Sequence, residues 1–400
     1  MIPPFARWLL TSLSLPLVAA GIAAQDLSVT WDDAIRIHSE DKSVDFKFGG
    51  RMHADWAAIS ASSALESFLG SPIEDGNEIR RARVYVSGTI DRYLIVKFQY
   101  DFEDGIADFK DVYGGITGIP GVGTFRAGQF KEPMGLEELN TSNSIVFLER
   151  SNANTFSAER NTGLMFNNHV EERFSWQLGV FRDTDAFGDS TGDGEYNITG
   201  RVTGTPIRTD DSLVHVGASV SVRSPNDGEV QITQSGEVHL APALADTGMI
   251  TGVDSRLDLG LEAAFVKGPL SLQGEYRQVE IDLMAGGMSP TFHGHYVQAA
   301  YTLTGESRGY DGKDGIFGGI KPDLDFRSDD GGVGAVELAV RYSGLDLTDA
   351  GILGGEVDGL TVGLNWYLNP NARTMLNFVN QDLDGTGGFD AVQLRFQVAF

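Results

Sequence analysis

Basic side chains recur at alternating positions along the chain. Lys47 and Arg51 share one face of a segment that alternates in polarity, and Arg81 and Arg83 share one face of the next. Alternation of this kind sends side chains to one face of a strand. Guanidinium and ammonium groups gathered on one face form charge-assisted hydrogen bonds with phosphate or carboxylate. The chemistry they could do is anion binding, and the candidate residues are Arg51, Arg81, Arg83, Lys97, Arg126 and Lys131.

Other chemistry has weaker support in the sequence. His293 and His295 could bind a metal through two imidazoles, and residues 183–195 have the acidic spacing of a calcium loop without the fixed order of an EF-hand. A membrane-embedded lipase would need Ser, His and a polar partner together, but the seven His are scattered along the chain. The absence of Cys excludes thiolate sites. We therefore expect no catalysis, no cofactor and no resident metal.

The elements that must position the basic residues are strands. Residues 43–60 place Phe46 and Trp56 on one face and charged residues on the other, and residues 78–90 and 93–103 alternate in the same way. Each segment is about ten residues or longer, which matches a tilted strand that crosses a membrane. Short turns alternate with longer Gly-rich and Asp-rich loops. This asymmetry predicts an all-β fold, a transmembrane antiparallel barrel.

Seventeen segments of the chain are candidate strands. Both ends of such a chain should lie on the periplasmic side, so the number of strands must be even. We expect sixteen strands, with one candidate misassigned, and eighteen as the alternative. The candidates are residues 43–60, 78–90, 93–103, 108–117, 123–130, 162–168, 173–182, 195–206, 213–223, 229–240, 254–266, 270–279, 292–304, 335–343, 360–368, 373–380 and 391–400.

Residues 130–160 interrupt this pattern with about thirty positions that lack sustained alternation. Loops of that length in a compact β-protein are usually functional. Phe147, Leu148 and Phe156 are too apolar for a freely solvated loop. We therefore expect the loop to fold into the barrel and constrict it; the alternative is a surface excursion with one helical turn around residues 134–139.

The composition and the N-terminal residues limit the possible partners and the cellular compartment of the protein. The net charge is −26, from 30 basic and 56 acidic residues, which argues against nucleic acid as a partner. Residues 1–24 have the pattern of a secretory signal, with Arg7, an apolar core and small residues near Ala24. We expect Sec-dependent export and cleavage near Ala24. After the signal peptide we expect an N-terminal periplasmic segment at residues 25–42 and the barrel at residues 43–400.

Several stretches resemble the phosphate-selective porin O and P family, most specifically GPLSLQGEY at residues 268–276, with FKFGGRMHADW at 46–56 and LNWYLNPNARTMLNF at 364–378. The resemblance covers essentially the whole mature chain. It implies a sixteen-stranded trimeric channel of the Gram-negative outer membrane whose third external loop folds into the lumen. It also implies phosphate transport, with selectivity from an arginine ladder and a lysine cluster. The long loop departs from that pattern, with Lys131, Arg150 and Arg160 against five Glu.

The predicted lumen faces are modestly basic, while the excess acid lies in loops at residues 183–195, 310–315 and 323–332. Rings of Arg and Lys in a narrow wet pore favour anions. We expect a passive channel for small anions, with phosphate implied by the family resemblance. The alternatives are a non-selective, carbohydrate or small-polar-solute porin, a structural barrel, or an outer-membrane enzyme. The expected partners are small anions, outer-membrane lipid and lipopolysaccharide, and two further copies of the chain in a homotrimer.

Overall fold

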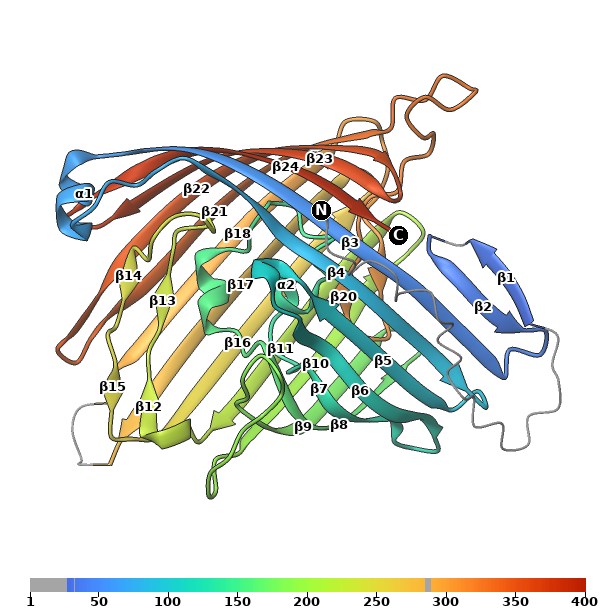
Figure 1. The fold of residues 1–400 in the computed structure, drawn as a ribbon, viewed down its shortest axis with the longest axis horizontal. Helices are drawn as coiled ribbons and strands as arrows, with labels where there is room; N and C mark the ends of the chain where they lie inside the picture. Colours follow the sequence, from blue (N-terminus) through green and yellow to red (C-terminus); the bar gives the residue numbers. More distant parts are fainter. Residues whose placement is uncertain (1–26, 32, 285–288) are drawn as a thin grey trace, which may run out of the picture.

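The structure is a computed structural model that describes residues 27–31, 33–284 and 289–400. The signal peptide expected at residues 1–24 lies outside the described residues, as do the first two residues of the expected periplasmic segment. The helices in the described part are short, and none of them is long and apolar enough to cross a membrane. Strands make up the rest of the regular structure (Figure 1).

Sixteen antiparallel strands close into one barrel, as predicted, because the last strand pairs with the first. The strands are β3 (Val44–Ala61), β4 (Gly76–Ile90), β5 (Leu94–Asp101), β6 (Asp108–Ile119), β7 (Gly123–Lys131), β8 (Arg160–Val170), β9 (Phe174–Arg182), β10 (Asn197–Arg208), β11 (Ser212–Arg223), β16 (Val253–Lys267), β17 (Leu270–Leu283), β18 (Thr291–Thr302), β21 (Ala335–Asp349), β22 (Ile352–Asn369), β23 (Ala372–Leu383) and β24 (Gly387–Ala399).

The barrel is apolar on its outside and polar on its inside, the reverse of a soluble protein. In β24, Leu394 is 40% exposed and Phe396 is 38% exposed, whereas Gln393, Arg395 and Gln397 are buried. The neighbouring strands β22 and β23 alternate in the same way. Side chains of successive residues point to opposite faces, so each strand offers one face to lipid and one to the lumen.

A hairpin of β1 (Leu27–Trp31) and β2 (Ile35–Ser39) extends the barrel wall. β2 pairs with the beginning of β3, with Ile35 opposite Phe48, and β1 pairs with β2. In Figure 1 the hairpin projects beyond one end of the barrel, on the side where the chain ends. This hairpin makes up the described part of the segment expected at residues 25–42.

The two ends of the barrel differ. At the end that holds the hairpin and Phe400, most strands are joined by tight turns. Asp91 and Arg92 form one such turn and Glu171 and Glu172 another, and all four have positive φ. The opposite end has longer connections, including residues 62–75 with α1 (Ser63–Leu69). We call these the turn end and the loop end.

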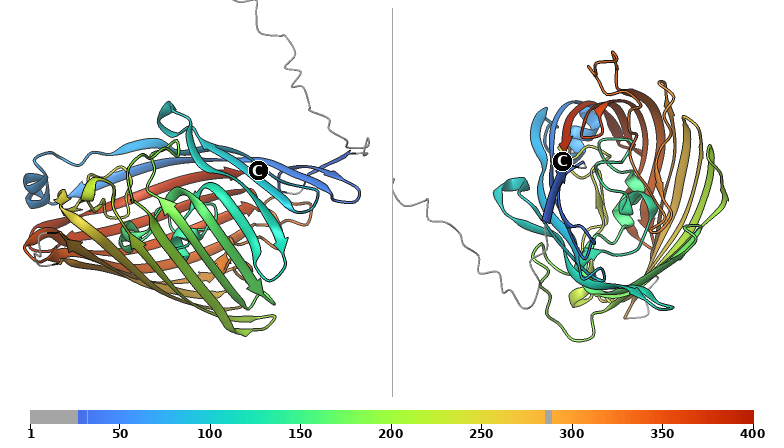
Figure 2. Two further views of the ribbon diagram at one scale, coloured as in Figure 1. Left: turned by 90° about the horizontal axis from the view of Figure 1, so that it is seen from below. Right: turned by 90° about the vertical axis from the view of Figure 1, so that its right-hand side faces the viewer.

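Three connections enter the barrel. The lumen loop is residues 132–159, with α2 (Leu136–Leu139) and a 3-10 turn (Asn152–Phe156). The second loop is residues 224–252, and the turn-end insert is residues 303–334 between β18 and β21. The right-hand view of Figure 2 looks into the barrel and shows connecting segments inside the ring of strands.

The strand predicted at residues 229–240 is wrong, because this segment belongs to the second loop. It contains β12 (Glu229–Val230) and β13 (Thr233–Gln234), which pair only with the short β15 (Ile250–Thr251) and β14 (Ala245–Asp246) of the same loop. Its apolar residues are buried against inward-facing apolar residues of the barrel wall, in an internal core that includes Val279 and Phe292. Their alternation therefore reflects packing in the lumen and not contact with lipid.

The acidic segment at residues 310–315 belongs to the turn-end insert, where β19 (Tyr310–Asp311) pairs with β20 (Ile316–Phe317). Arg201 of the wall donates to the carbonyl oxygens of Asp314 and Gly315, and Phe317 packs against Leu136 of the lumen loop. The segment therefore reaches from the turn end into the lumen, where Asp314 lines a cavity.

Candidate pore and basic cavity

The lumen loop is fixed to one side of the barrel wall. Arg373 donates to the carbonyl of Ile145 at 2.9 Å, and Arg395 donates to the carbonyl of Leu148 at 2.6 Å. On the same side, the carboxylate of Glu275 in β17 accepts from the backbone N–H groups of residues 136 and 137. These bonds hold the loop against β17 and β21–β24. The space that remains in the lumen lies toward β3–β8.

The apolar residues of the lumen loop explain why it packs inside. Phe147, Leu148 and Phe156 are all buried. The guanidinium of Arg341 stands 4.5 Å from the ring centre of Phe147, a cation–π contact. Burial of each large apolar side chain contributes on the order of 1.5–3 kcal/mol, which favours the inward position over a solvated one.

A cavity of about 350 Å³ lies between the lumen loop and the wall formed by β3–β7. Nine cationic side chains line it against four carboxylates. The cations are Arg51, Arg80, Arg81, Arg83, Lys97, Lys110, Lys131, Arg150 and Arg160, and the acids are Glu103, Asp111, Glu138 and Glu159. The cavity is therefore basic although the whole chain is strongly acidic.

This basic cavity shares lining residues with three neighbouring cavities. Toward the loop end it shares Arg80, Arg150 and Glu159 with a cavity of about 370 Å³. Toward the turn end it shares Arg51 and Lys97 with one of about 480 Å³ that Phe400 also lines. A side cavity of about 220 Å³ shares Lys97 and Lys131 with it and is lined by Arg126. The basic cavity thus lies between one cavity toward the loop end and one toward the turn end.

Several cations of the basic cavity are neutralised by carboxylates. Asp101 accepts from Arg83 at 2.5 Å, and Asp111 accepts from Lys97 at 2.5 Å and from Arg160 at 2.8 Å. In the lumen loop, Glu138 pairs with Lys131 at 2.9 Å and with Arg150 at 3.3 Å, and Glu149 pairs with Arg80 at 3.0 Å. These pairs fix the side chains in position and remove part of their charge.

Arg81 and Arg51 carry charge that these acids do not neutralise. Arg81 is only 4% exposed, and its Nε and Nη1 find no hydrogen-bond partner among the described residues. The carboxylate of Glu149 lies 3.9 Å from Nη1, too far for a hydrogen bond. Arg51 donates to the hydroxyls of Thr141 and Ser142 in the lumen loop. A buried guanidinium with free donors is a strong anchor for an incoming anion.

Two acids of the lumen loop, Glu138 and Glu149, have lowered pKa values. Burial alone would raise the pKa of Glu138, but Arg150 and Lys131 outweigh it and hold that pKa far below its ordinary value. Glu149 behaves in the same way, because Arg80, Arg81 and Arg395 lower its pKa more than burial raises it. Glu137 is the exception, since burial raises its pKa. The loop's ion pairs with Arg150 and Arg80 therefore persist from neutral pH into acid.

The structure brings together all six residues singled out from the sequence. Five of them line the basic cavity and Arg126 lines the adjoining one, where its guanidinium lies over the ring of Tyr113. The sequence analysis missed Arg80. A bulge in β4 shifts the register between His53 and Ala54 and turns both Arg80 and Arg81 inward. Two consecutive arginines in an alternating strand were the signal that could have revealed it.

The two metal candidates from the sequence have other roles in the structure. His293 stacks on the ring of Tyr276, at 6.2 Å between ring centres. Asp183, the first residue of the calcium-like loop, accepts from Arg223 and from Asn161 at 3.1 Å. Among the described residues a different group, Glu78, Glu103 and His239, gathers three ligand-type side chains.

Comparison with known proteins decides the family. The family model described as phosphate-selective porin O and P matches residues 46–400. The chain belongs to this family. The porin is 26% identical to Porin O of Pseudomonas aeruginosa over 434 aligned positions, covering 93% of each chain. It is 29% identical over 377 residues to an uncharacterised protein of Caulobacter vibrioides, covering 91% of this chain and 73% of that one.

Solved structures agree on the fold. An anion-selective porin from Comamonas acidovorans superposes with a TM-score of 0.57 at 14% identity, covering 89% of this chain and 100% of that one. The outer-membrane channel DcaP of Acinetobacter baumannii gives 0.55 at 12% identity, covering 91% and 99%. Family and fold make this protein a porin, an outer-membrane channel of a Gram-negative cell. The turn end, which holds Phe400, therefore faces the periplasm and the loop end faces the exterior.

Proposed function

We propose that this porin conducts small anions passively, with phosphate as the family-implied substrate. The observation that carries the proposal is the excess of cations in the basic cavity, nine against four carboxylates, with Arg81 offering free donors. An anion that enters a narrow pore loses water, and fixed guanidinium and ammonium groups replace those hydrogen bonds. Arg51, Arg81, Arg83, Lys97, Arg126 and Lys131 are the proposed anion path.

We also propose that the lumen loop is the constriction. It occupies the side of the lumen next to β17 and β21–β24. Its Glu138 and Arg150 line the basic cavity, where Glu138 pairs with Lys131 of β7. A solute must pass between this loop and the wall that carries Arg81 and Arg83. Passage through a gap lined in this way depends on charge as well as on size. The channel would need no catalytic residue and no cofactor.

The acidic composition does not oppose this proposal. Of the acidic segment at residues 310–315, Asp314 lines the side cavity but not the basic cavity, and Asp183 is paired with Arg223. Charges separated by more than about 10 Å are largely screened at physiological salt. The anion therefore meets the local basic charge of the path and not the net charge of the chain.

Phosphate block is the experiment that tests the proposal. Single-channel chloride current is recorded in a planar bilayer while phosphate is raised through the millimolar range. We expect the current to fall in a saturable way, because phosphate binds the basic cavity more tightly than chloride does. Sulfate at the same ionic strength is the control for charge alone. A current that phosphate leaves unchanged would favour the alternative, a non-selective or small-polar-solute porin.

The expected assembly and environment belong to the same proposal. The outward-facing apolar residues of β22–β24 suit outer-membrane lipid, including the acyl chains of lipopolysaccharide. A homotrimer is the assembly that the family resemblance implies. Cross-linking of the protein in its native membrane, followed by denaturing electrophoresis, tests it: a ladder that ends at three copies supports the trimer, and single chains alone contradict it.

A further inference from the structure

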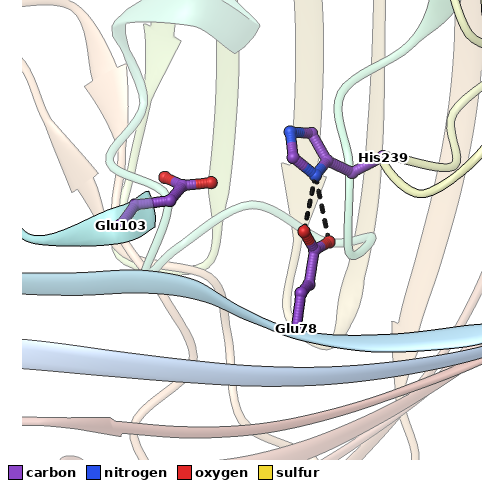
Figure 3. A group of neighbouring side chains, drawn as sticks. All are labelled: Glu78, Glu103 and His239. Carbon is purple, nitrogen blue, oxygen red and sulfur yellow. Dashed lines mark hydrogen bonds and ion pairs between the residues drawn. The ribbon is translucent and has the colours of Figure 1, made fainter. Parts of the chain in front are cut away.

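We propose that Glu78, Glu103 and His239 form a binding site for a divalent transition-metal ion such as Zn²⁺ at the external entrance of the path. Each of the three residues offers one ligand atom, and these atoms all lie within 4.8 Å of one another. Figure 3 shows the imidazole of His239 directed at the carboxylate of Glu78, with Glu103 to one side. They come from three distant parts of the chain: β4, the β5–β6 connection and the second loop.

Glu78 and His239 already face each other with their ligand atoms. Nδ1 of His239 lies 3.0 Å from one carboxylate oxygen of Glu78 and 2.8 Å from the other. With its proton on Nδ1, the imidazole donates a hydrogen bond to this carboxylate. A metal ion would take the place of that proton, and the imidazole would then carry its proton on Nε2.

The donor set indicates which metal. One imidazole nitrogen and two carboxylates are ligands typical of Zn²⁺, with bonds of about 2.0–2.2 Å and an open position for water. Copper and nickel suit the same donors. Ca²⁺ and Mg²⁺ are hard cations that take oxygen ligands, so neither would gain from the imidazole nitrogen of His239. The site therefore selects borderline metals over the alkaline earths. To complete the site, the Glu103 side chain would have to turn toward Glu78 and His239.

Arg80 permits the change that metal binding requires. It now donates to Glu103 at 2.7 Å, so an ion would compete with it for that carboxylate. Arg80 also makes two bonds to Glu149, at 3.0 and 3.1 Å, and these would remain. Releasing Glu103 therefore leaves no buried charge without a partner. The two carboxylates would then compensate the charge of the ion.

The position of the site gives it a structural consequence. His239 lines the cavity at the loop end, and Glu103 lines the basic cavity. Two residues before His239, Glu237 is fixed inside the barrel by Arg341 and Ser343, at 2.5 Å each. A metal at His239 would add a second anchor and join the second loop to β4 beside the entrance. The site does not depend on whether the channel prefers anions.

Isothermal titration of the folded, tag-free porin in detergent with ZnCl2 tests the site. We expect one saturable Zn²⁺ per chain, lost in His239→Ala and in Glu78→Gln, and weakened by about tenfold or more in Glu103→Gln, because each removes a ligand. His169→Ala, which removes an exposed histidine at the end of β8, is the matched control and should bind like the wild type.

Three results would overturn the proposal. They are the absence of saturable Zn²⁺ binding by the wild type, unchanged affinity in His239→Ala, and Ca²⁺ binding as tight as Zn²⁺ at the same site. Each variant is first checked for the heat-dependent gel shift of a folded barrel. The titration is independent of the phosphate block, so failure of one leaves the other interpretable.

Discussion

Two sets of arginines in the same lumen differ in their hydrogen bonds. In β21 and β24, Arg341 is held by Glu237 at 2.5 Å and Glu137 at 3.0 Å, and Arg395 is held by Asp55 at 2.6 Å. On β4, two strands from β24, Arg81 has two nitrogen donors without a hydrogen-bond partner among the described residues, and its contact with Glu149 is long, at 3.9 Å. Hydrogen bonding, and not residue type, distinguishes them. An arginine that donates to several partners fixes the inner loops, whereas one with free donors is available to a solute.

The largest loss of stability is expected on removal of an arginine whose ion pairs are complete. Arg341→Ala leaves the carboxylates of Glu237 and Glu137 buried without their cation, and breaking a buried pair costs about 3–5 kcal/mol. The free energy of unfolding, measured by urea titration of tryptophan fluorescence in detergent, should fall by that order. Adding Glu237→Gln to the variant should restore part of the loss. An unchanged unfolding midpoint would show that these pairs do not hold the inner loops.

Deletion of residues 140–154 tests the lumen loop that those arginines hold. It removes the carbonyl acceptors of Arg373 and Arg395 and the segment that lies against their wall. If this loop narrows the path, single-channel conductance should rise by about twofold or more. Deletion of residues 186–193, in the β9–β10 connection, is the control and should leave the conductance near the wild-type value. Equal conductance in both deletions would remove the loop from the path.

Arg81→Ala sharpens the comparison within the basic wall. We expect the permeability ratio of chloride to potassium to fall a few-fold, because the variant loses a guanidinium with free donors from the basic cavity. Stability should change little, since Arg81 donates no hydrogen bond to the described residues. Arg83→Ala should instead lower stability by about 1–3 kcal/mol, because it leaves Asp101 without its 2.5 Å partner.

Arg182→Ala is the matched control for the selectivity measurement. This arginine ends β9 and pairs with Glu195 at 3.0 Å, away from the four cavities of the path. Its removal changes the net charge by the same amount as Arg81→Ala. A control that lowers the permeability ratio as much as Arg81→Ala would mean that general charge, and not the basic cavity, sets the preference.

The smallest change in stability is expected on removal of Asp41, which forms an exposed ion pair with Arg92 on the periplasmic side. Asp41 accepts from the backbone of Ser43 and the hydroxyl of Ser39, and with Arg92 these bonds lower its pKa from 3.8 to about 2. A lowered carboxyl pKa adds stability that is complete above pH 3.8 and is lost as the pH falls through about 2. Asp41→Asn should therefore lower the melting temperature slightly at pH 6, with the difference vanishing near pH 2. A difference that grows in acid would contradict this sign.

The sequence predicted the barrel and its inward-facing basic residues because both depend on local alternation. The sixteen strands, the inward face of Arg51, Arg81 and Arg83, and the apolar character of the long loop all follow from period-2 patterning and burial. Alternation does not show whether the apolar face of a segment contacts lipid or packs inside the lumen, because both environments favour apolar side chains. That is why residues 229–240, with Val230 and Ile232 buried in the lumen, were taken for a wall strand.

The pairing of individual side chains was beyond the sequence. Arg81 and Arg83 are two residues apart and look equivalent, yet only Arg83 meets Asp101, because that contact depends on the β4–β5 register and on the bulge at Arg80. The group of Glu78, Glu103 and His239 likewise depends on the course of the second loop. Contacts between distant segments need the three-dimensional path of loops that carry no regular pattern.

The reversal potential of the wild-type porin across a KCl gradient tests the central claim most directly. It needs no variant and reports the sign of the selectivity that the basic cavity gives the path. We expect the potential to lie on the chloride side, despite the net charge of −26, because the permeating ion meets the nine cations of the cavity. A potential on the potassium side would contradict the account and make the unpaired Arg81 a feature of structure alone.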